Sequence, residues 1–450
     1  MKRAGRLVRG IAFVILAVTF PANNASHGAS DKAPFVLGVG VHLQSGKRQL
    51  AKSLDKLAGA GVVALRDDAP WGRVEEQQGE LRIPTDWDRL VNEANARGIR
   101  VLLILDYGNR FYDDGDKPIS PEAVIAFTRY AAFVAGYFKG RVHYYEIWNE
   151  WDHRTGNTRP GDAASYVPLA KSVYHAVKEA DPGATVLAGA VTPEGIRRGF
   201  LAQIVRLGIL EAADALSLHT YVHCRRDRAP EDWAAWMREI DRELRRLSGR
   251  SISLFITEMG WPSHSGACGI SLEEQGRYLA RMFLLAKALP FIDGVWWYDL
   301  QNDGLDPANR EHNFGLLGND MTPKPAYEAL RSISPLVREG RYVGRLDVGV
   351  SGIHVLRFEQ GTTSVLATWK EDGTPCLAIR LISSTPFRAE LWRLSEGQSS
   401  VPWKSARVRS DEREKEHYTD IPLSNMPQVF SLSEQSLPLG KLEATCADNR

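Results

Sequence analysis

Two glutamates at the ends of strand-like runs are the residues of this chain best placed to do chemistry. Glu150 closes a run that begins at Val142, and Glu258 closes a run that begins at Ser251. Both runs are rich in β-branched and aromatic residues and stop where an irregular segment begins. Two carboxylates held across one pocket can break a glycosidic bond, because one protonates the leaving oxygen while the other attacks the sugar or activates water. The pair therefore predicts a glycosidase-type site.

A third glutamate, Glu146, lies in the same run as Glu150. Side chains alternate along a strand, so Glu146, Trp148 and Glu150 are expected on one face. Glu146 would lie deeper than Glu150. We expect it to be a buried structural carboxylate paired with an arginine such as Arg66.

Strand-like and helical patterns alternate from residue 35 to about residue 334. The strand-like runs cover residues 35–42, 62–66, 100–105, 142–148, 185–190, 215–219, 253–257 and 294–298. Helical patterns lie between them, and Ser120 before Pro121 and Ser271 before Glu274 are typical helix starts. Eight such repeats in about 300 residues favour closure into a (β/α)₈ barrel, an α/β fold of the TIM type. In such a barrel, catalytic groups gather at the C-terminal ends of the strands.

The pattern changes after Leu336, where short strand-like runs separated by turn residues replace the helices. Such a pattern predicts a small all-β domain, of the sandwich type. The predicted organisation is an N-terminal segment over residues 1–30, a catalytic barrel over 31–336 and a β-sandwich domain over 337–450.

The N-terminus has the layout of an export signal. Lys2, Arg3, Arg6 and Arg9 precede an apolar run over residues 11–20, and small and polar residues follow. The run is short for an ordinary membrane-spanning helix. We expect an exported protein, periplasmic or secreted; cleavage of the segment and its retention as an inner-membrane anchor both stay open.

Four cysteines remain, namely Cys224, Cys268, Cys376 and Cys446. An even number in an exported protein indicates disulfides, although their connectivity does not follow from the sequence. The first two follow neighbouring barrel strands and could share one rim, and the other two share the C-terminal domain. Four free thiols are the alternative.

The segments around the glutamate pair resemble a known superfamily. Trp148-Asn149-Glu150, with Thr257-Glu258 three strands later, resembles the clan A retaining glycoside hydrolases. Within that clan the chain is most similar to family 39, including bacterial glycosidases of biofilm exopolysaccharide of the Psl type. The segments 313–317 (Asn-Phe-Gly-Leu-Leu) and 323–327 (Pro-Lys-Pro-Ala-Tyr) carry this finer likeness.

The resemblance implies a role for each glutamate. Glu258 would be the nucleophile that forms a covalent glycosyl-enzyme, and Glu150 would be the acid/base. A nearby negative Glu258 should raise the pKa of Glu150, and esterification of Glu258 would remove that influence. Asn149 would, by the same resemblance, hydrogen-bond the 2-hydroxyl of the sugar.

Several polar residues could support the pair. His219 and Tyr221 are two positions apart at the end of the sixth run, so both can face the site. In the clan, a tyrosine at such a position hydrogen-bonds the nucleophile. Arg66 ends the second run and could hold Glu258 ionised, or it could be an ion partner in the barrel core. His42 ends the first run and is a further candidate.

Aromatic rings bind sugars by stacking on the apolar face of a pyranose. Trp297 or Tyr298, at the end of the last run, is expected in the floor of the sugar site. Trp71 and Trp261 are expected as its walls. In each case a purely structural role in the core is the alternative.

Other chemistries have little support in the sequence. The net charge of +1 does not favour a nucleic-acid partner. The chain lacks a His-Glu-x-x-His segment and a Cys-x-x-Cys pair, so no metal site and no cofactor are predicted. Gly38-x-Gly40 lacks the third glycine of a dinucleotide site, because Leu43 takes its place.

The sequence thus predicts a retaining glycoside hydrolase that acts inside a bacterial exopolysaccharide, with a polysaccharide or oligosaccharide as its partner. An exo-acting β-glycosidase of the β-xylosidase kind is the enzymatic alternative. A catalytically silent polysaccharide-binding matrix protein is the alternative from another class. The sugar, the linkage and the oligomeric state stay open.

Overall fold

The computed structural model describes residues 34–46, 48–156, 158–383, 388–392, 405–406, 409–411, 416–433 and 441–446. All described residues belong to one compact unit, Pro34–Arg450. The predicted export segment over residues 1–30 lies outside the described residues, so it stays a prediction. Among the described residues, no helix has the length and apolar character needed to span a membrane.

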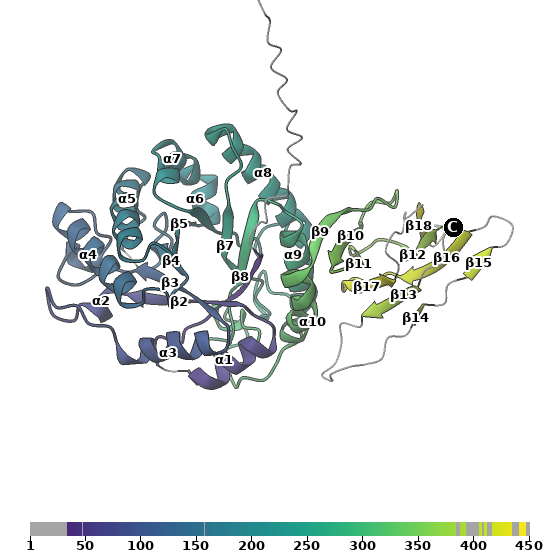
Figure 1. The fold of residues 1–450 in the computed structure, drawn as a ribbon, viewed down its shortest axis with the longest axis horizontal. Coiled ribbons are helices and arrows are strands. Elements are labelled where there is room, and N and C mark those ends of the chain that lie inside the picture. The colour runs from purple at the N-terminus through teal and green to yellow at the C-terminus, as the bar shows by residue number, and fades with distance from the viewer. Residues whose placement is uncertain are drawn as a thin grey trace, which may run out of the picture. The chain divides into compact units, whose positions relative to one another are not determined.

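Eight parallel strands close into a barrel in sequence order (Figure 1). They are β1 Val36–Gly40, β2 Ala64–Pro70, β3 Arg100–Asp106, β4 Tyr144–Ile147, β5 Thr185–Val191, β6 Ala215–His219, β7 Leu254–Met259 and β8 Ile292–Trp297. Closure comes from β8 pairing with β1, where Val36 lies opposite Gly294 and Val39 lies opposite Trp297. The predicted (β/α)₈ fold is confirmed.

Side-chain alternation divides the apolar residues of the strands between two layers. On β3, Leu102 and Ile104 belong to the cluster inside the barrel. Leu103 and Leu105 belong to the larger cluster between the strands and the helices. Strands buried on both faces read as continuous apolar runs, which is why the sequence revealed them without clear alternation.

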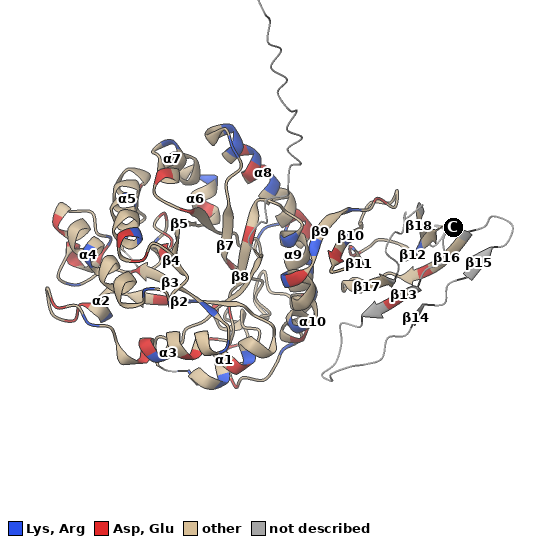
Figure 2. Cartoon of the chain, in the orientation of Figure 1, with Lys and Arg blue, Asp and Glu red and all other residues tan. Residues whose placement is uncertain are grey.

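An outer ring of helices covers the barrel (Figure 1). The longer ones are α1 Leu50–Gly59, α3 Thr85–Ala96, α4 Pro121–Tyr137, α5 Ala163–Ala180, α8 Pro230–Ser248, α9 Leu272–Lys287 and α10 Pro325–Glu339, and the shorter ones are α2 Trp71–Val74, α6 Pro193–Arg197 and α7 Phe200–Arg206. The predicted caps are present, since Ser120 accepts a hydrogen bond from the Ala123 N–H and Ser271 accepts one from the Glu274 N–H. Figure 2 shows Lys and Arg interspersed with Asp and Glu on the outer helices, in keeping with the small net charge.

Two antiparallel sheets follow the barrel. The first has the order β14-β13-β17-β11-β10-β9 and the second the order β15-β16-β12-β18. Their strands are β9 Arg341–Arg345, β10 Ile353–Gln360, β11 Thr363–Lys370, β12 Cys376–Ser383, β13 Arg388–Trp392, β14 Ser405–Ala406, β15 Arg409–Asp411, β16 Glu416–Pro422, β17 Gln428–Ser433 and β18 Lys441–Cys446. Leu366 of the first sheet and Ile379 of the second share one buried cluster, so the predicted sandwich is confirmed.

Strand β11 shows how the sandwich is joined to the barrel. Val365, Ala367 and Trp369 alternate with Leu366 and belong to the same apolar cluster as the barrel helices. The indole N–H of Trp369 donates to Glu231 of α8 over 2.7 Å. One face of the sheet is thus buried against the barrel and the other against the second sheet.

Both cysteine pairs form disulfides. Cys224 is bonded to Cys268 between the loops that follow β6 and β7, and Cys376 is bonded to Cys446 between β12 and β18. The prediction of disulfides, one pair on the barrel rim and one in the C-terminal domain, is confirmed.

Packing inside the barrel can be tested by a substitution at Gly38 of β1. A Cβ atom at this position would lie 2.4 Å from Cδ1 of the buried Trp296. We expect Gly38→Ala to lower the free energy of unfolding by about 1–3 kcal/mol, because the indole has no room to move.

Gly40→Ala on the same strand is the control, since its Cβ would meet nothing closer than 3.6 Å. Urea denaturation should find the Gly40 variant close to the wild type. Equal losses in the two variants would contradict the packing argument.

Candidate active site

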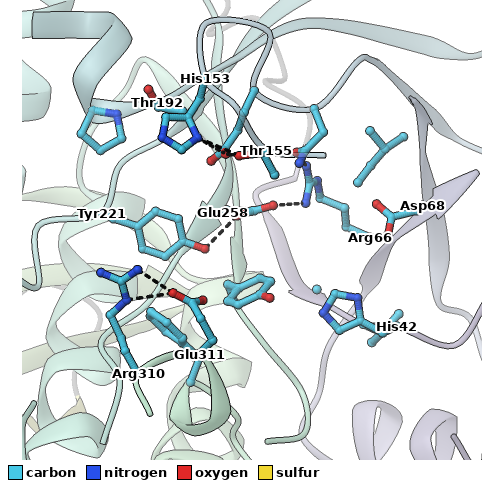
Figure 3. A pocket seen from close by; sticks show the side chains of 18 of the residues that line it. His42, Arg66, Asp68, His153, Thr155, Thr192, Tyr221, Glu258, Arg310 and Glu311 are labelled. Atoms are coloured by element: carbon cyan, nitrogen blue, oxygen red, sulfur yellow. Dashed lines mark hydrogen bonds and ion pairs between the residues drawn. The ribbon is translucent and has the colours of Figure 1, made fainter. Parts of the chain in front are cut away.

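A cavity of about 810 Å³ opens at the C-terminal ends of the barrel strands (Figure 3). Glu150 and Glu258 both line it, together with Arg66, Asn149 and Tyr221. The cavity therefore lies where the sequence predicted the catalytic rim of a barrel.

Glu258 lies on β7 and is held by two donors. Nη1 of Arg66 donates to Oε1 over 2.6 Å, and the hydroxyl of Tyr221 donates to Oε2 over 2.8 Å (Figure 3). Each carboxylate oxygen therefore has its own partner, which fixes the plane of the carboxylate. An acceptor-only carboxylate directed into a cavity is suited to act as a nucleophile.

Glu150 lies just after β4, in a segment that leaves the strand conformation. Trp148 has φ 66° and Glu150 has φ 50°, both in the left-handed region. The expected alternation therefore fails at Trp148, whose ring packs beside Phe127 of α4 rather than on the face of Glu146. This turn brings the Glu150 carboxylate over the barrel mouth, at some cost in backbone energy.

The carboxylate of Glu150 has polar partners of its own. Oε1 lies 2.9 Å from Nδ1 of His219, and Oε2 accepts a hydrogen bond from the hydroxyl of Thr155. Nδ1 of His153 lies 3.7 Å from Oε2. Glu150 is therefore held by groups that can give or take a proton, whereas Glu258 is held by an arginine and a tyrosine.

The two carboxylates are close together. One oxygen of Glu150, one oxygen of Glu258 and a ring nitrogen of His219 all lie within 4.8 Å of one another. Carboxyl groups of retaining glycosidases are about 5–5.5 Å apart, whereas inverting enzymes need about 6.5–9.5 Å to admit a water molecule. The spacing favours direct attack by one carboxylate.

His219 and Glu150 shift each other's pKa in opposite directions. Burial lowers the pKa of His219, but the negative charges of Glu258 and Glu150 outweigh it and raise that pKa. Burial raises the pKa of Glu150, but the hydrogen bond and charge of His219 outweigh it and lower that pKa. The expected rise in the pKa of Glu150 is therefore not found, because the hydrogen bond and charge of His219 lower that pKa.

Arg66 connects three parts of the site. Its Nε donates to Glu146 over 2.8 Å, and its Nη2 donates to Oδ1 of Asn149 over 3.0 Å, in addition to the contact with Glu258. Burial lowers the pKa of Arg66, but Glu146 and Glu258 outweigh it and raise that pKa. Glu146 is fully buried, and Arg66 and His219 lower its pKa against the effect of burial. The predicted structural pairing of Glu146 with Arg66 is present.

The structure brings most of the predicted site residues together. The cavity is lined by Glu150, Glu258, Asn149, Tyr221, Arg66, His42 and Tyr298, and His219 contacts both glutamates from below. The side chain of His219 is fully buried, so it acts on the glutamates rather than on a sugar.

Trp71, Trp261 and Trp297 do not line the cavity, and the expectation that they contact sugar is wrong in this structure. All three are fully buried. Trp71 opens α2 and stacks on Tyr112. Trp297 points outward to the helices because the preceding Trp296 occupies the barrel interior. Tyr298 is the aromatic residue of this group that reaches the cavity.

Sequence reasoning missed Asp68, which lines the cavity (Figure 3). It lies two positions after Arg66 on β2, so alternation from Arg66 could have found it. Burial raises the pKa of Asp68, and burial together with the neighbouring Asp68 carboxylate raises the pKa of Asp106 well above its usual range. A partly exposed carboxylate here can accept hydrogen bonds from sugar hydroxyls.

Two groups of described residues have the spacing of metal ligands. One is Glu150, His219 and Glu258, whose oxygens are already engaged by Arg66, Tyr221 and Thr155. The other is His42, Asp299 and Asp303, where the guanidinium of Arg48 already lies against both aspartates. In each group an arginine already pairs with at least one of the carboxylates.

Several solved structures that resemble this one are glycoside hydrolases. A family 39 glycoside hydrolase from Bacteroides cellulosilyticus is 26% identical with a TM-score of 0.72, over 88% of this chain and 80% of that one. A family 39 enzyme from Xanthomonas axonopodis pv. citri is 16% identical with a TM-score of 0.64, over 89% and 95%. A monomeric β-xylosidase from Caulobacter crescentus is 14% identical with a TM-score of 0.62, over 89% and 96%. No protein-family model and no curated protein matches the chain.

The likeness to the 26% identical family 39 enzyme confirms the predicted resemblance to clan A glycoside hydrolases. It also confirms the prediction of an enzyme that hydrolyses glycosidic bonds, and hence of a carbohydrate substrate.

The role of Arg66 can be tested through stability. We expect Arg66→Met to lower the free energy of unfolding by about 3–5 kcal/mol near neutral pH, because Glu146 would keep a buried charge without its partner. The folded-state pKa of Glu146 is lowered, so its ionised form stabilises the wild type above the unfolded pKa, and this contribution is lost as the pH falls. Thermal denaturation at several pH values should therefore show the largest deficit at neutral pH and a smaller one in acid.

Arg380→Met is the matched control, because Arg380 pairs with Asp420 at the surface. It should cost less than about 1 kcal/mol. A deficit of the Arg66 variant that does not change with pH would contradict the electrostatic explanation.

Proposed function

We propose that this protein is an exported retaining glycoside hydrolase that cleaves inside the chains of a bacterial exopolysaccharide. Glu258 is the nucleophile and Glu150 the acid/base. The observation that carries the proposal is the pair of glutamate oxygens within 4.8 Å of each other, each carboxylate with a different set of partners. The likeness to the family 39 glycoside hydrolase from Bacteroides cellulosilyticus supports it.

The first step forms a covalent bond between the sugar and the enzyme. Glu258 attacks the anomeric carbon while Glu150 donates a proton to the leaving oxygen, and the glycosidic bond breaks. The donated proton belongs to the pair that Glu150 forms with His219, whose Nδ1 lies 2.9 Å from Oε1 of Glu150. Arg66 and Tyr221 keep Glu258 in the orientation needed for attack.

The second step releases the sugar. Glu150, now without its proton, removes a proton from water, and the oxygen of that water attacks the anomeric carbon and displaces Glu258. Glu258 carries no charge in this intermediate, because it is esterified. Of the two carboxylates that raise the pKa of His219, only Glu150 then remains charged. His219 and Glu150 then share the proton taken from water.

The shape of the cavity supports cleavage within a chain. Its lining includes His42 and Asp68 near β1 and β2 as well as Thr192 and Glu194 near β5. Polar residues thus lie on both sides of the glutamate pair, so a glycan can extend beyond the cleaved bond in both directions.

Export is supported by the basic and apolar layout of residues 1–20 and by the two disulfides. The substrate class, a matrix exopolysaccharide, follows from the resemblance of the sequence to glycosidases of the Psl type.

The first test compares the wild type and Glu258→Gln on bacterial exopolysaccharides and plant β-glycans, with products sized by mass spectrometry. We expect mixed oligosaccharides from the wild type and none from the variant, because an amide cannot act as the nucleophile. Glu239→Gln, an exposed glutamate of α8, is the control. Release of monosaccharide alone would favour an exo-acting β-glycosidase, and binding without cleavage would favour a matrix-binding protein.

The two roles can be separated with azide as an added nucleophile. We expect Glu150→Ala to lose about 10²–10⁴-fold in rate on poor leaving groups. Azide should rescue it and give a glycosyl azide of retained configuration, whereas rescue of Glu258→Ala should invert the configuration. The opposite stereochemistry would exchange the assigned roles.

The proton that His219 and Glu150 share predicts a change in the pH profile of the reaction. In the wild type the pair holds its proton up to the raised pKa of His219. In His219→Gln only Glu150 can hold it. The alkaline limb of kcat/KM should therefore move to lower pH in this variant.

His153→Gln is the comparison, since His153 is half-exposed and 3.7 Å from Glu150. Its alkaline limb should move less. An unchanged limb in His219→Gln would contradict the shared proton.

A further inference from the structure

A second cavity, of about 630 Å³, borders the first at His42. Its lining is almost wholly polar and includes Gln44, Arg48, Asn302 and Asp303. These residues come from the segment after β1 and from the loop after β8. The site described above does not use this cavity.

The order of the strands shows on which side of the cleaved bond the second cavity lies. In a closed barrel of eight strands, the β8–β1 boundary lies opposite the β4–β5 boundary. Glu150 follows β4 and protonates the leaving oxygen, so the leaving part of the glycan lies on the β4–β5 side. Figure 3 shows His42 and Asp68 across Glu258 from His153 and Thr192. The part of the glycan attached to Glu258 therefore extends toward His42 and the second cavity.

The polar groups of this cavity are held in place. Nη1 of Arg48 donates to the Gln301 carbonyl over 2.8 Å, and Nη2 is paired with Asp303. Arg48 is mostly covered, whereas Asp303 is about one-third exposed. A fixed arginine–carboxylate pair at the edge of a cavity offers donors and acceptors that match neighbouring sugar hydroxyls.

A buried carboxyl beneath the cavity has unused hydrogen-bonding capacity. Asp299 is 1% exposed, and neither of its oxygens has a hydrogen-bond partner among the described residues. Its Oδ2 lies 3.8 Å from Nε2 of His42 and 3.9 Å from Nη2 of Arg48, both of which face the cavity. Buried polar groups are rarely left without partners, and small shifts of His42 or Arg48 on binding could supply them.

We infer that the second cavity is a binding subsite for the sugar that precedes the reacting sugar on its non-reducing side, with His42, Arg48 and Asp303 as its polar contacts. This inference rests on the proposed glycosidase function. It commits the enzyme to substrates with at least two sugars on the Glu258 side of the cleaved bond. An exo-acting enzyme that releases single sugars would have no use for such a subsite.

The test compares kcat/KM on paired 4-nitrophenyl β-glycosides, namely xyloside with xylobioside and glucoside with cellobioside, and sizes the products of whichever polysaccharide the wild type degrades. We expect kcat/KM for each disaccharide glycoside to be at least about ten-fold higher than for its monosaccharide partner. A few hydrogen bonds from the second sugar to charged groups would give a difference of this size. In Arg48→Ala and Asp303→Asn this preference should fall to about two-fold or less. On polysaccharide, the shortest major product from the non-reducing end should be a disaccharide or longer.

Arg97→Ala is the matched control, because Arg97 is a part-exposed arginine that pairs with Asp55 away from the cavity. It should keep the full preference. Asp303→Asn preserves size and keeps the test usable if Arg48→Ala does not fold.

Cleavage with no disaccharide preference, or with an equal preference in all variants, would overturn the subsite and leave the glycosidase function intact. Monosaccharide as the sole product would overturn both the subsite and the proposed cleavage inside the chain. Absence of cleavage of every glycoside and polysaccharide would overturn the proposed function, and the subsite with it.

Discussion

The arrangement of the site depends on one buried cation, the guanidinium of Arg66. It is 4% exposed and donates to Glu146, Glu258 and Asn149. These partners belong to β4, to β7 and to the segment after β4, so one side chain from β2 sets the relative positions of three parts of the barrel. Burying a charge costs roughly several kcal/mol, and only well-oriented hydrogen-bond and ion-pair partners offset this cost. The hydrogen bonds that satisfy the Arg66 guanidinium also orient the Glu258 carboxylate toward the cavity.

The two glutamates differ because their partners differ. Glu258 faces donors that keep their protons, a guanidinium and a phenol whose pKa is raised by burial and by Glu258 itself. Glu150 faces an imidazole and a hydroxyl. Chemically similar carboxylates acquire separate tasks when their surroundings differ in this way. His219 connects the two, because it lies 2.9 Å from Glu150 and 3.5 Å from Glu258, so a change of charge on either is felt by the other.

Much of the barrel and the position of the two glutamates at its rim could be predicted from the sequence because both follow from strand periodicity. Apolar runs locate the strands, and a carboxylate just past a strand lies on the rim wherever the barrel closes. Residues beyond a strand's end are harder to place. Trp148 leaves the alternation through a positive φ, and Trp71 turns inward because α2 starts there. Asp68, by contrast, lies within β2, and its position beside Arg66 was available in the alternation.

The loop that carries Tyr221, one of the two partners of Glu258, is linked to the loop after β7 at the rim of the barrel. Cys224 follows Tyr221 by three residues and is bonded to Cys268 in the loop after β7. Arg228 strengthens this link, since its carbonyl accepts from the indole of Trp261 and its side chain donates to the Cys268 carbonyl. The segment with Tyr221 is therefore tied to the loop that follows the strand of Glu258. The proposed role of Glu258 as a nucleophile would tolerate little misplacement. The covalent bond at the rim holds both segments, and so keeps the phenol of Tyr221 at the carboxylate of Glu258.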